Sequence, residues 1–232
     1  LEQQDFLYSV VLRGDHPARV AVVGSIVDIF VSSEEGFFGA VIDPRTRILS
    51  LTVTEAGYFI DHRSRELDTT VAQVAQDIAN YHAQDEPPLT AVGFITKSLK
   101  MRQMHGLAPL TVLSCDNLPG NGDLTKVMVL HFLKLVEDFE LLAWVEEKCS
   151  FPNSMVDRIT PATKPWNPER PDAFSDSIRK TLCASVGFKD QWPIITEPFR
   201  QWVIEDDFVS GRPAWERKGA LFVTDVAPYE TM

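Results

Sequence analysis

Short apolar runs and segments of helical spacing alternate along most of this chain. Strands are predicted where β-branched and aliphatic residues cluster over a few positions, a pattern typical of buried strands. These runs fill 48–53, 110–114 and 220–226, and they open the longer segments 20–31 and 192–206.

Helices are predicted where apolar residues recur every three or four positions. The spacing is weak at 70–82 and clear at 91–105, where Gly106 closes the helix. A second clear segment, 124–148, forms either two helices or one helix that bends near Asp138. A shorter helix is predicted at 175–186, after a Pro-rich and polar surface segment.

Strands that alternate with helices favour an α/β fold with a largely parallel sheet. In such sheets, ligands bind beyond the carboxyl ends of the strands. Three of the predicted strands end in small polar residues, in the sequences "TVTE", "VLSCDN" and "FVTDV". The stretch "TVLSCDNLPGNG" (111–122) is therefore either the edge of a ligand crevice or an ordinary transition from strand to loop.

Three candidate site residues also have a structural interpretation, and for Glu230, within three residues of the end of the given sequence, it is fraying. Asn117 offers an amide that could donate to a developing oxyanion, or it could form an Asx turn. Asp157 stands beside Arg158, where a structural ion pair is the alternative to a functional role. The "GNG" at 120–122 lacks the third glycine and the strand–turn–helix context of a dinucleotide fingerprint, and we predict a loop there.

The composition narrows the possible functions. The chain has 232 residues, 44% of them hydrophobic and 24% charged, which is typical of a soluble globular protein. A net charge of -11 without a basic stripe argues against nucleic-acid binding. No apolar run approaches the roughly 18–20 residues of a membrane helix. The five histidines have no paired spacing, so we expect no metal site.

Cysteine usage indicates the compartment. The three cysteines, Cys115, Cys149 and Cys183, form no disulfide framework, so we expect a reducing, cytoplasmic location.

Five motifs in the same order carry a resemblance to a known family. They are "SLTVTEAGY" (50–58), "TVLSCDNLPGNG" (111–122), "FPNSMVDRITP" (151–161), "EPFRQWVIEDDFVSGRPAWE" (197–216) and "DVAPYE" (225–230). Together they resemble the mannitol dehydrogenase family of polyol-specific long-chain dehydrogenases. That family includes mannitol 2-dehydrogenases and the reductases of fructuronate and tagaturonate.

The resemblance implies zinc-independent hydride transfer with NAD or NADP, in an enzyme whose general base is a lysine. It also implies that 1–232 is an incomplete Rossmann-like dehydrogenase domain, with a Pro-rich insertion near 164–174. We expect the first βαβ segment, with its glycine-rich turn, to precede Leu1. The helical C-terminal domain, with the catalytic lysine, is expected after Met232.

The resemblance assigns roles to five residues. Asn117 matches the asparagine that polarises the reacting oxygen and lies at the cofactor. Glu230 matches a carboxylate near the catalytic lysine that guides the proton to solvent. Asp157 matches a substrate-binding residue, and Thr54 and Glu55 match the strand-end segment beside the cofactor.

These roles favour a polyol and ketose as the substrate pair, with mannitol and fructose first. The alternatives are a hexuronate (fructuronate or tagaturonate) reductase, a non-catalytic truncated homologue that serves as a binding module, and a split enzyme completed by other chains. We expect a small-molecule partner and no nucleic acid, membrane or metal.

The 232-residue polypeptide, produced alone, is expected to show no turnover, because it lacks a base to remove the hydroxyl proton as hydride leaves. The measurement is NADH oxidation with fructose as the acceptor. Robust ketose-dependent oxidation by this polypeptide would contradict the expectation.

Overall fold

The computed structural model describes residues 1–13, 19–30, 35–61, 63–83, 86–162, 187, 190 and 193–230. Their contacts divide the chain into two compact units. The first unit draws on 1–29 and 157–200, and the second on 30–156 and 201–232. The expected insertion at 164–174, the expected helix at 175–186, and Cys183 lie outside the described residues.

The first unit contains a small mixed sheet in the order β2-β1-β6. β1 (Tyr8–Leu12) pairs antiparallel with β2 (Arg19–Val23) and parallel with β6 (Ile194–Thr196). A 3-10 helix, η1 (Glu2–Gln4), precedes β1. Buried Asp190 accepts the Ser9 N–H at 2.6 Å, which fixes the start of β1.

The second unit contains the parallel strands β3 (Ile48–Leu51) and β4 (Thr111–Ser114). A parallel bridge joins Thr111 to Ser150, in the segment that leads into β5. The remaining strands pair in the order β5-β7-β8, and they are β5 (Ser154–Asp157), β7 (Gln201–Glu205) and β8 (Leu221–Val223). β7 and β8 are parallel. The last residue of β5, Asp157, is counted with the first unit.

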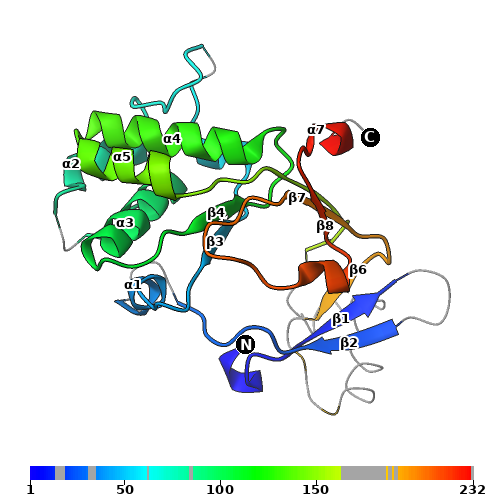
Figure 1. Ribbon diagram of the computed structural model, residues 1–232. Helices are drawn as coiled ribbons and strands as arrows, with labels where there is room; N and C mark the ends of the chain where they lie inside the picture. Colours follow the sequence, from blue (N-terminus) through cyan, green and yellow to red (C-terminus); the bar gives the residue numbers. More distant parts are fainter. Residues whose placement is uncertain are drawn as a thin grey trace. The chain divides into compact units, whose positions relative to one another are not determined.

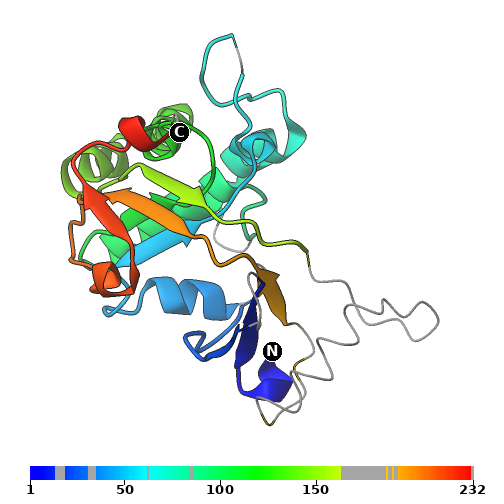
Figure 2. The same cartoon turned by 90° about the vertical axis from the view of Figure 1, so that its right-hand side faces the viewer.

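The second unit also contains helices, which surround its strands in the two views (Figures 1 and 2). They are α1 (Glu35–Val41), α2 (Ala72–Asn80), α3 (Ala91–Met104), α4 (Asn121–Leu135), α5 (Phe139–Lys148) and α7 (Ala227–Glu230), with the 3-10 helices η2 (Glu55–Tyr58) and η3 (Trp215–Lys218). None of the described helices has the length and hydrophobicity needed to cross a membrane.

Strand β4 is the centre of the core, because all four of its residues are buried. Alternate side chains of a strand point to opposite faces of the sheet. Val112 accordingly packs in the cluster formed with α3, α4 and α5, whereas Leu113 packs with Ile204 and Ala220 in a second cluster. Burial on both faces is expected of a strand in a parallel sheet that is covered on each side.

Most of the predicted elements are confirmed in the described residues. The helix predicted at 91–105 is α3, which begins after Thr90, whose hydroxyl accepts the Gly93 N–H at 3.0 Å. The segment 124–148 contains two helices, and Asp138 caps the second by accepting the Leu141 N–H at 3.0 Å. β1 and α1 were not predicted, because neither carries a clear periodic pattern.

The prediction of a loop through "GNG" is wrong. Gly120 precedes the helix with a φ of 64°, but Asn121 and Gly122 are its first two residues. The segment therefore does have the strand–turn–helix arrangement that its sequence did not reveal. The helix begins this early because acceptors for its free N–H groups come from distant parts of the chain, as described below.

Gly122 allows α4 to lie directly against the segment that leads into β5. A Cβ atom at this position would stand 2.3 Å from the Phe151 carbonyl oxygen and 2.5 Å from that of Pro152. Both are backbone atoms, so no side chain can turn aside to make room. Close contact between the helix and this segment therefore requires glycine.

We predict that Gly122→Ala lowers the free energy of unfolding by roughly 1–3 kcal/mol, the usual cost of overpacking a closely packed site. Urea unfolding is the measurement. The matched control is Gly39→Ala in α1, where an added Cβ meets nothing within 4 Å. The control should be neutral or stabilising, since alanine has the higher helix propensity. Equal effects of the two substitutions would contradict the prediction.

Candidate functional site

The carboxyl ends of β3 and β4 meet at one edge of the sheet. The strands pair in register, with Leu51 opposite Ser114. The Cys115 N–H extends the pairing by donating to the Leu51 carbonyl at 2.8 Å. The turns that follow the two strands therefore leave the sheet side by side, at the edge where α/β proteins place their ligands.

The turn after β3 carries Thr54 and Glu55, both exposed. Thr54 is extended (φ -80°, ψ 164°), and its carbonyl accepts the Gly57 N–H at 2.7 Å. Its side chain makes no capping bond to the 3-10 helix that begins at Glu55. A hydroxyl and a carboxylate are therefore available to a ligand at the end of β3.

The turn after β4 is held by Asp116 and presents Asn117. Asp116 Oδ1 accepts the Leu118 N–H at 2.9 Å, so the Asx turn considered for Asn117 is made by its neighbour instead. Asn117 is exposed, and its amide makes no hydrogen bond to the described residues. That amide, with two donors and one acceptor, is left free to bind a ligand.

Beneath these turns lies the buried hydroxyl of Tyr58, the last residue of η2. The Tyr58 side chain is 1% exposed, and its hydroxyl donates to Asp116 Oδ2. It also lies 2.5 Å from Ser114 Oγ and 3.4 Å from Thr125 Oγ1. Burial, and then the hydrogen bond to Asp116, raise the pKa of Tyr58 to about 12.

The cysteine beside Asn117 is an unreactive thiol. Burial raises the pKa of Cys115 to about 11. Because the thiolate is the nucleophilic form, this side chain stays protonated and unreactive near neutral pH. Among the described residues, no group of three His, Cys, Asp or Glu side chains is placed to hold a metal ion.

The turn that carries Asn117 is tied to α7 by Glu230. Glu230 Oε1 accepts the Gly120 N–H at 2.9 Å, just before α4 begins. Both views place α7 next to α4 (Figures 1 and 2). The other oxygen, Oε2, makes no hydrogen bond to the described residues. Asn117 and Glu230, which are far apart in the sequence, are thus attached to the same short turn.

The first amides of α4 are capped by a side chain from the segment before β5. Asn153 Oδ1 accepts the N–H groups of Gly122 and Asp123, at 2.9 and 3.0 Å. Asn153 Nδ2 donates to Asp123 Oδ2 at 3.1 Å and to Glu205 Oε1 at 3.2 Å. A helix N-terminus normally attracts phosphate through such free amides. Here those amides already have partners within the protein.

Buried Asn121 fastens the turn to β5. Its Nδ2 donates to the carbonyls of Asp116 (3.0 Å) and Ser154 (2.8 Å), and its Oδ1 accepts the Ser154 N–H at 2.9 Å. Both Nδ2 protons and the Oδ1 atom of Asn121 are therefore engaged within the protein, in bonds that hold the turn against β5.

Asp157 ends β5 and is exposed. It belongs to the first unit, whereas Asn117, Glu230 and the end of β3 belong to the second. The ion pair considered for Asp157 and Arg158 is not among those of the described residues. Arg158 instead donates to the Glu197 carbonyl, at 3.1 Å from Nη2 and 3.3 Å from Nε. The carboxylate of Asp157 is therefore not committed to its neighbour.

The structure thus gathers Thr54, Glu55, Asn117 and Glu230 at adjacent turns of the second unit. Four residues that organise these turns were missed at the level of sequence, namely Tyr58, Asp116, Asn121 and Asn153. The available signal was their presence inside "TEAGY", "SCDNLPGNG" and "FPNS", which belong to the motifs that carry the family resemblance. Nothing local in those motifs says which polar side chain is buried and which is exposed.

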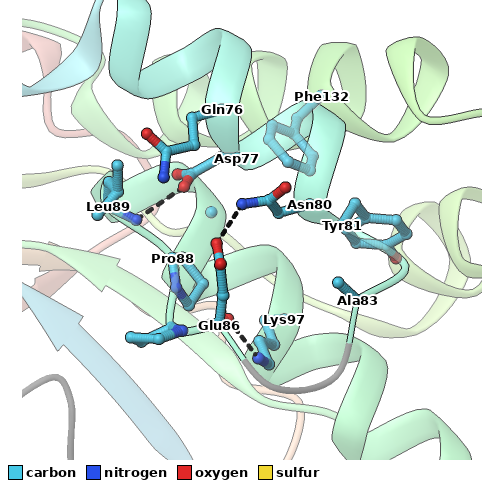
Figure 3. Close-up of a pocket in the computed structure, with 12 residues that line it drawn as sticks. Gln76, Asp77, Asn80, Tyr81, Ala83, Glu86, Pro88, Leu89, Lys97 and Phe132 are labelled. Carbon is cyan, nitrogen blue, oxygen red and sulfur yellow. Dashed lines mark hydrogen bonds between the residues drawn. The ribbon is translucent and has the colours of Figure 1, made fainter.

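A narrow recess lies elsewhere in the second unit, between the end of α2 and the start of α3 (Figure 3). Asp77 Oδ1 accepts the Leu89 N–H at 2.7 Å, Asn80 donates to the Glu86 carboxylate, and Lys97 donates to the Glu86 carbonyl at 3.0 Å. The recess has a volume of about 20 Å³. That is room for about one water molecule, so it is too small for a sugar.

A larger hollow, of about 260 Å³, borders β3 on the side of α1 and α3. Its lining is apolar apart from one serine, and comprises Phe30, Phe37, Leu49, Ser50, Leu51, Ala91, Phe94 and Ile95. A polyol needs hydrogen-bonding partners along its length, which this hollow does not supply. The strand-end turns remain the candidate site.

Residues 1–217 match the family model described as the mannitol dehydrogenase Rossmann domain. The chain belongs to the mannitol dehydrogenase family. The Rossmann-like α/β fold expected from the sequence is thereby confirmed, and so is the resemblance carried by the five motifs.

Several relatives in this family are similar over the whole chain. The chain is 41% identical to D-mannonate oxidoreductase of Escherichia coli (strain K12), covering 100% of this chain and 45% of the relative. It is 39% identical to mannitol 2-dehydrogenase of Aspergillus terreus (strain NIH 2624 / FGSC A1156), covering 99% of this chain and 43% of the relative.

A solved structure matches this chain with a similar identity and coverage. Pseudomonas fluorescens mannitol 2-dehydrogenase, in a ternary complex with NAD and D-mannitol, superposes with a TM-score of 0.85 and is 40% identical. The match covers 99% of this chain and 44% of that one. The chain thus spans less than half the length of these relatives.

We predict that Asn153→Ala destabilises the protein by roughly 0.5–2 kcal/mol, the usual cost of removing a helix N-cap acceptor. The change leaves the amides of Gly122 and Asp123 without their acceptor. Thermal or urea unfolding is the measurement.

The matched control is Asn80→Ala, which removes an asparagine whose contact with the Glu86 carboxylate is exposed. Loss of an exposed contact should change stability by less than about 0.5 kcal/mol. If Asn153→Ala lowered stability no more than the control does, the cap would contribute nothing to stability.

Proposed function

We propose that the protein containing this chain interconverts a polyol and a ketose by hydride transfer with NAD or NADP, with mannitol and fructose as the favoured pair. The observation that carries the proposal is the exposed, unengaged amide of Asn117 at the shared edge of β3 and β4. It occurs in a chain that is 40% identical to a mannitol 2-dehydrogenase solved with NAD and D-mannitol.

The groups at this edge fit the reactive end of a nicotinamide dinucleotide better than its pyrophosphate. Thr54, Glu55 and Asn117 offer a hydroxyl, a carboxylate and an amide, which suit ribose hydroxyls and a carboxamide. The amides that begin α4 are occupied by Asn153 and Glu230, so they are not free to bind the pyrophosphate. The bound dinucleotide supplies the hydride acceptor or donor.

In this proposal Asn117 stabilises the substrate oxygen as its charge develops. A neutral amide donates a hydrogen bond to an alkoxide without taking up the proton itself. Tyr58 and Cys115 are unsuited to removing that proton, because both have pKa values raised by burial, to about 12 and about 11. The proposal therefore relies on the lysine base that the resemblance implies.

Glu230 and Asp157 complete the proposed roles. Glu230 holds the Asn117 turn with one carboxylate oxygen, and its other oxygen is available to pass the proton toward solvent. Exposed Asp157 would accept hydrogen bonds from substrate hydroxyls.

A second candidate is the reduction of a hexuronate. It is favoured by the 41% identity to D-mannonate oxidoreductase of Escherichia coli. A hexuronate carries a carboxylate, so an enzyme acting on it needs an additional cation that a polyol dehydrogenase does not.

We predict that Asn117→Ala lowers kcat about 10²–10³-fold, as loss of an oxyanion donor typically does. The test uses the protein encoded by the complete reading frame and follows NADH and NADPH oxidation with fructose and with fructuronate. The preferred ketone distinguishes the two candidate functions. Asn80→Ala, in α2 and away from the turns, is the control and should leave kcat unchanged.

Two outcomes contradict the proposal. One is an unmodified protein that oxidises neither dinucleotide with either ketone. The other is an Asn117→Ala variant with the turnover of the Asn80→Ala control.

A further inference from the structure

The two turns of the candidate site are joined by a partly buried hydrogen bond. Tyr58 closes the 3-10 helix that begins just after Thr54, and Asp116 immediately precedes Asn117. The Tyr58 hydroxyl donates to Asp116 Oδ2 from a side chain that is 1% exposed. The bond therefore connects the turn after β3 with the turn after β4, and its donor side chain is buried.

The Tyr58 hydroxyl lies close to two other hydroxyls, those of Ser114 and Thr125, and each of the three carries one proton. The Thr125 hydroxyl donates to the Asn121 carbonyl at 2.7 Å, and the Ser114 hydroxyl donates to Asp116 Oδ2 at 2.6 Å. The single proton of Tyr58 goes to the same carboxylate oxygen. The hydroxyls of Tyr58 and Ser114 thus converge on one oxygen of the Asp116 carboxylate.

Asp116 uses its remaining groups to fix the backbone on both sides of Asn117. Its Oδ1 accepts the Leu118 N–H at 2.9 Å, and its carbonyl accepts a hydrogen bond from Asn121 Nδ2 at 3.0 Å. Asn117 is therefore held between two anchored residues while its own side chain stays exposed. A change at Tyr58 would reach Asn117 through this carboxylate.

We propose that Tyr58 and Asp116 are positioning residues, which set where the Asn117 amide lies relative to the turn that carries Thr54 and Glu55. The inference rests on the proposed function for its kinetic consequence, because it assigns Asn117 to the substrate oxygen. Its structural part, the anchoring of the Asn117 turn by Tyr58, holds independently of which reaction is catalysed.

The first test is Tyr58→Phe, which keeps the ring and removes the hydroxyl. The matched control is Tyr81→Phe, because the half-buried Tyr81 also donates to an aspartate, Asp138 Oδ2, at 2.8 Å. Tyr81 follows α2 and contacts none of the site residues. Each substitution therefore removes a tyrosine hydroxyl that donates to an aspartate, one at the candidate site and one away from it.

We expect Tyr58→Phe to lower kcat/KM roughly 10- to 100-fold, the effect of losing a hydrogen bond to a charged group. Because both turns are loosened, KM for the dinucleotide should rise as well. The primary isotope effect with dinucleotide deuterated at the transferred position should increase, since a misplaced Asn117 slows hydride transfer itself. Tyr81→Phe should leave the isotope effect and KM unchanged.

Hydrogen exchange of the amides in 115–120 is the second measurement, made on the same full-length proteins. Tyr58→Phe should accelerate exchange at Leu118 and Gly120 about 10-fold or more, since the carboxylate that holds the turn loses a partner. Tyr81→Phe should leave the exchange of these amides unchanged.

Unchanged protection of these amides in Tyr58→Phe overturns the inference, whatever the activity. Unmodified protein without turnover would refute the proposed function, while the exchange result still decides the inference.

Asp116→Asn serves if Tyr58→Phe fails to fold, because asparagine keeps an acceptor for the Leu118 N–H. Where both variants fold, the double variant should lose no more activity than the worse single variant, since both act through one interaction. Additive losses, or equal isotope effects in Tyr58→Phe and Tyr81→Phe, would contradict a positioning role.

Discussion

The parallel pairing of β3 with β4 is the constraint on which the candidate site depends. It brings the carboxyl ends of two strands that are distant in sequence to one edge. Because β4 is buried on both faces, its own side chains form core and cannot meet a ligand. Polar chemistry is therefore confined to the turns that follow the strands, where each backbone group needs a partner supplied by a side chain.

Those partners separate the polar residues into two groups. Asp116, Asn121 and Asn153 satisfy backbone groups of the turns, and each is part of a bonded network. Asn117 and Thr54 make no such side-chain contacts and face outward. A rigid inner layer of this kind limits the motion of the outer residues, which favours a fixed geometry at the reacting oxygen.

Local signals were sufficient to predict several elements. Gly106 marks the end of α3, and Asp138 marks the break between α4 and α5, because capping depends on residues next to the helix end. Two of the three predicted strands that end in polar residues are the paired β3 and β4, whereas the third is β8, which pairs with β7. These inferences needed no knowledge of distant contacts, and the structure agrees with them.

Other features depend on residues far away in sequence and could not be predicted. The start of α4 was taken for a loop because its acceptors come from Asn153 and Glu230. Asp116 rather than Asn117 makes the Asx turn, and the same Asp116 carboxylate accepts the hydroxyl of the distant Tyr58. A sequence of adjacent polar residues does not contain that information.

The capping of α4 also has an electrostatic consequence. Asn153 is flanked by the carboxylates of Asp123 and Glu205, and Glu230 lies at the same helix end. The positive end of the helix dipole is thus already neutralised by acidic groups. A phosphate that approached from this side would meet repulsion where most nucleotide-binding helices offer attraction.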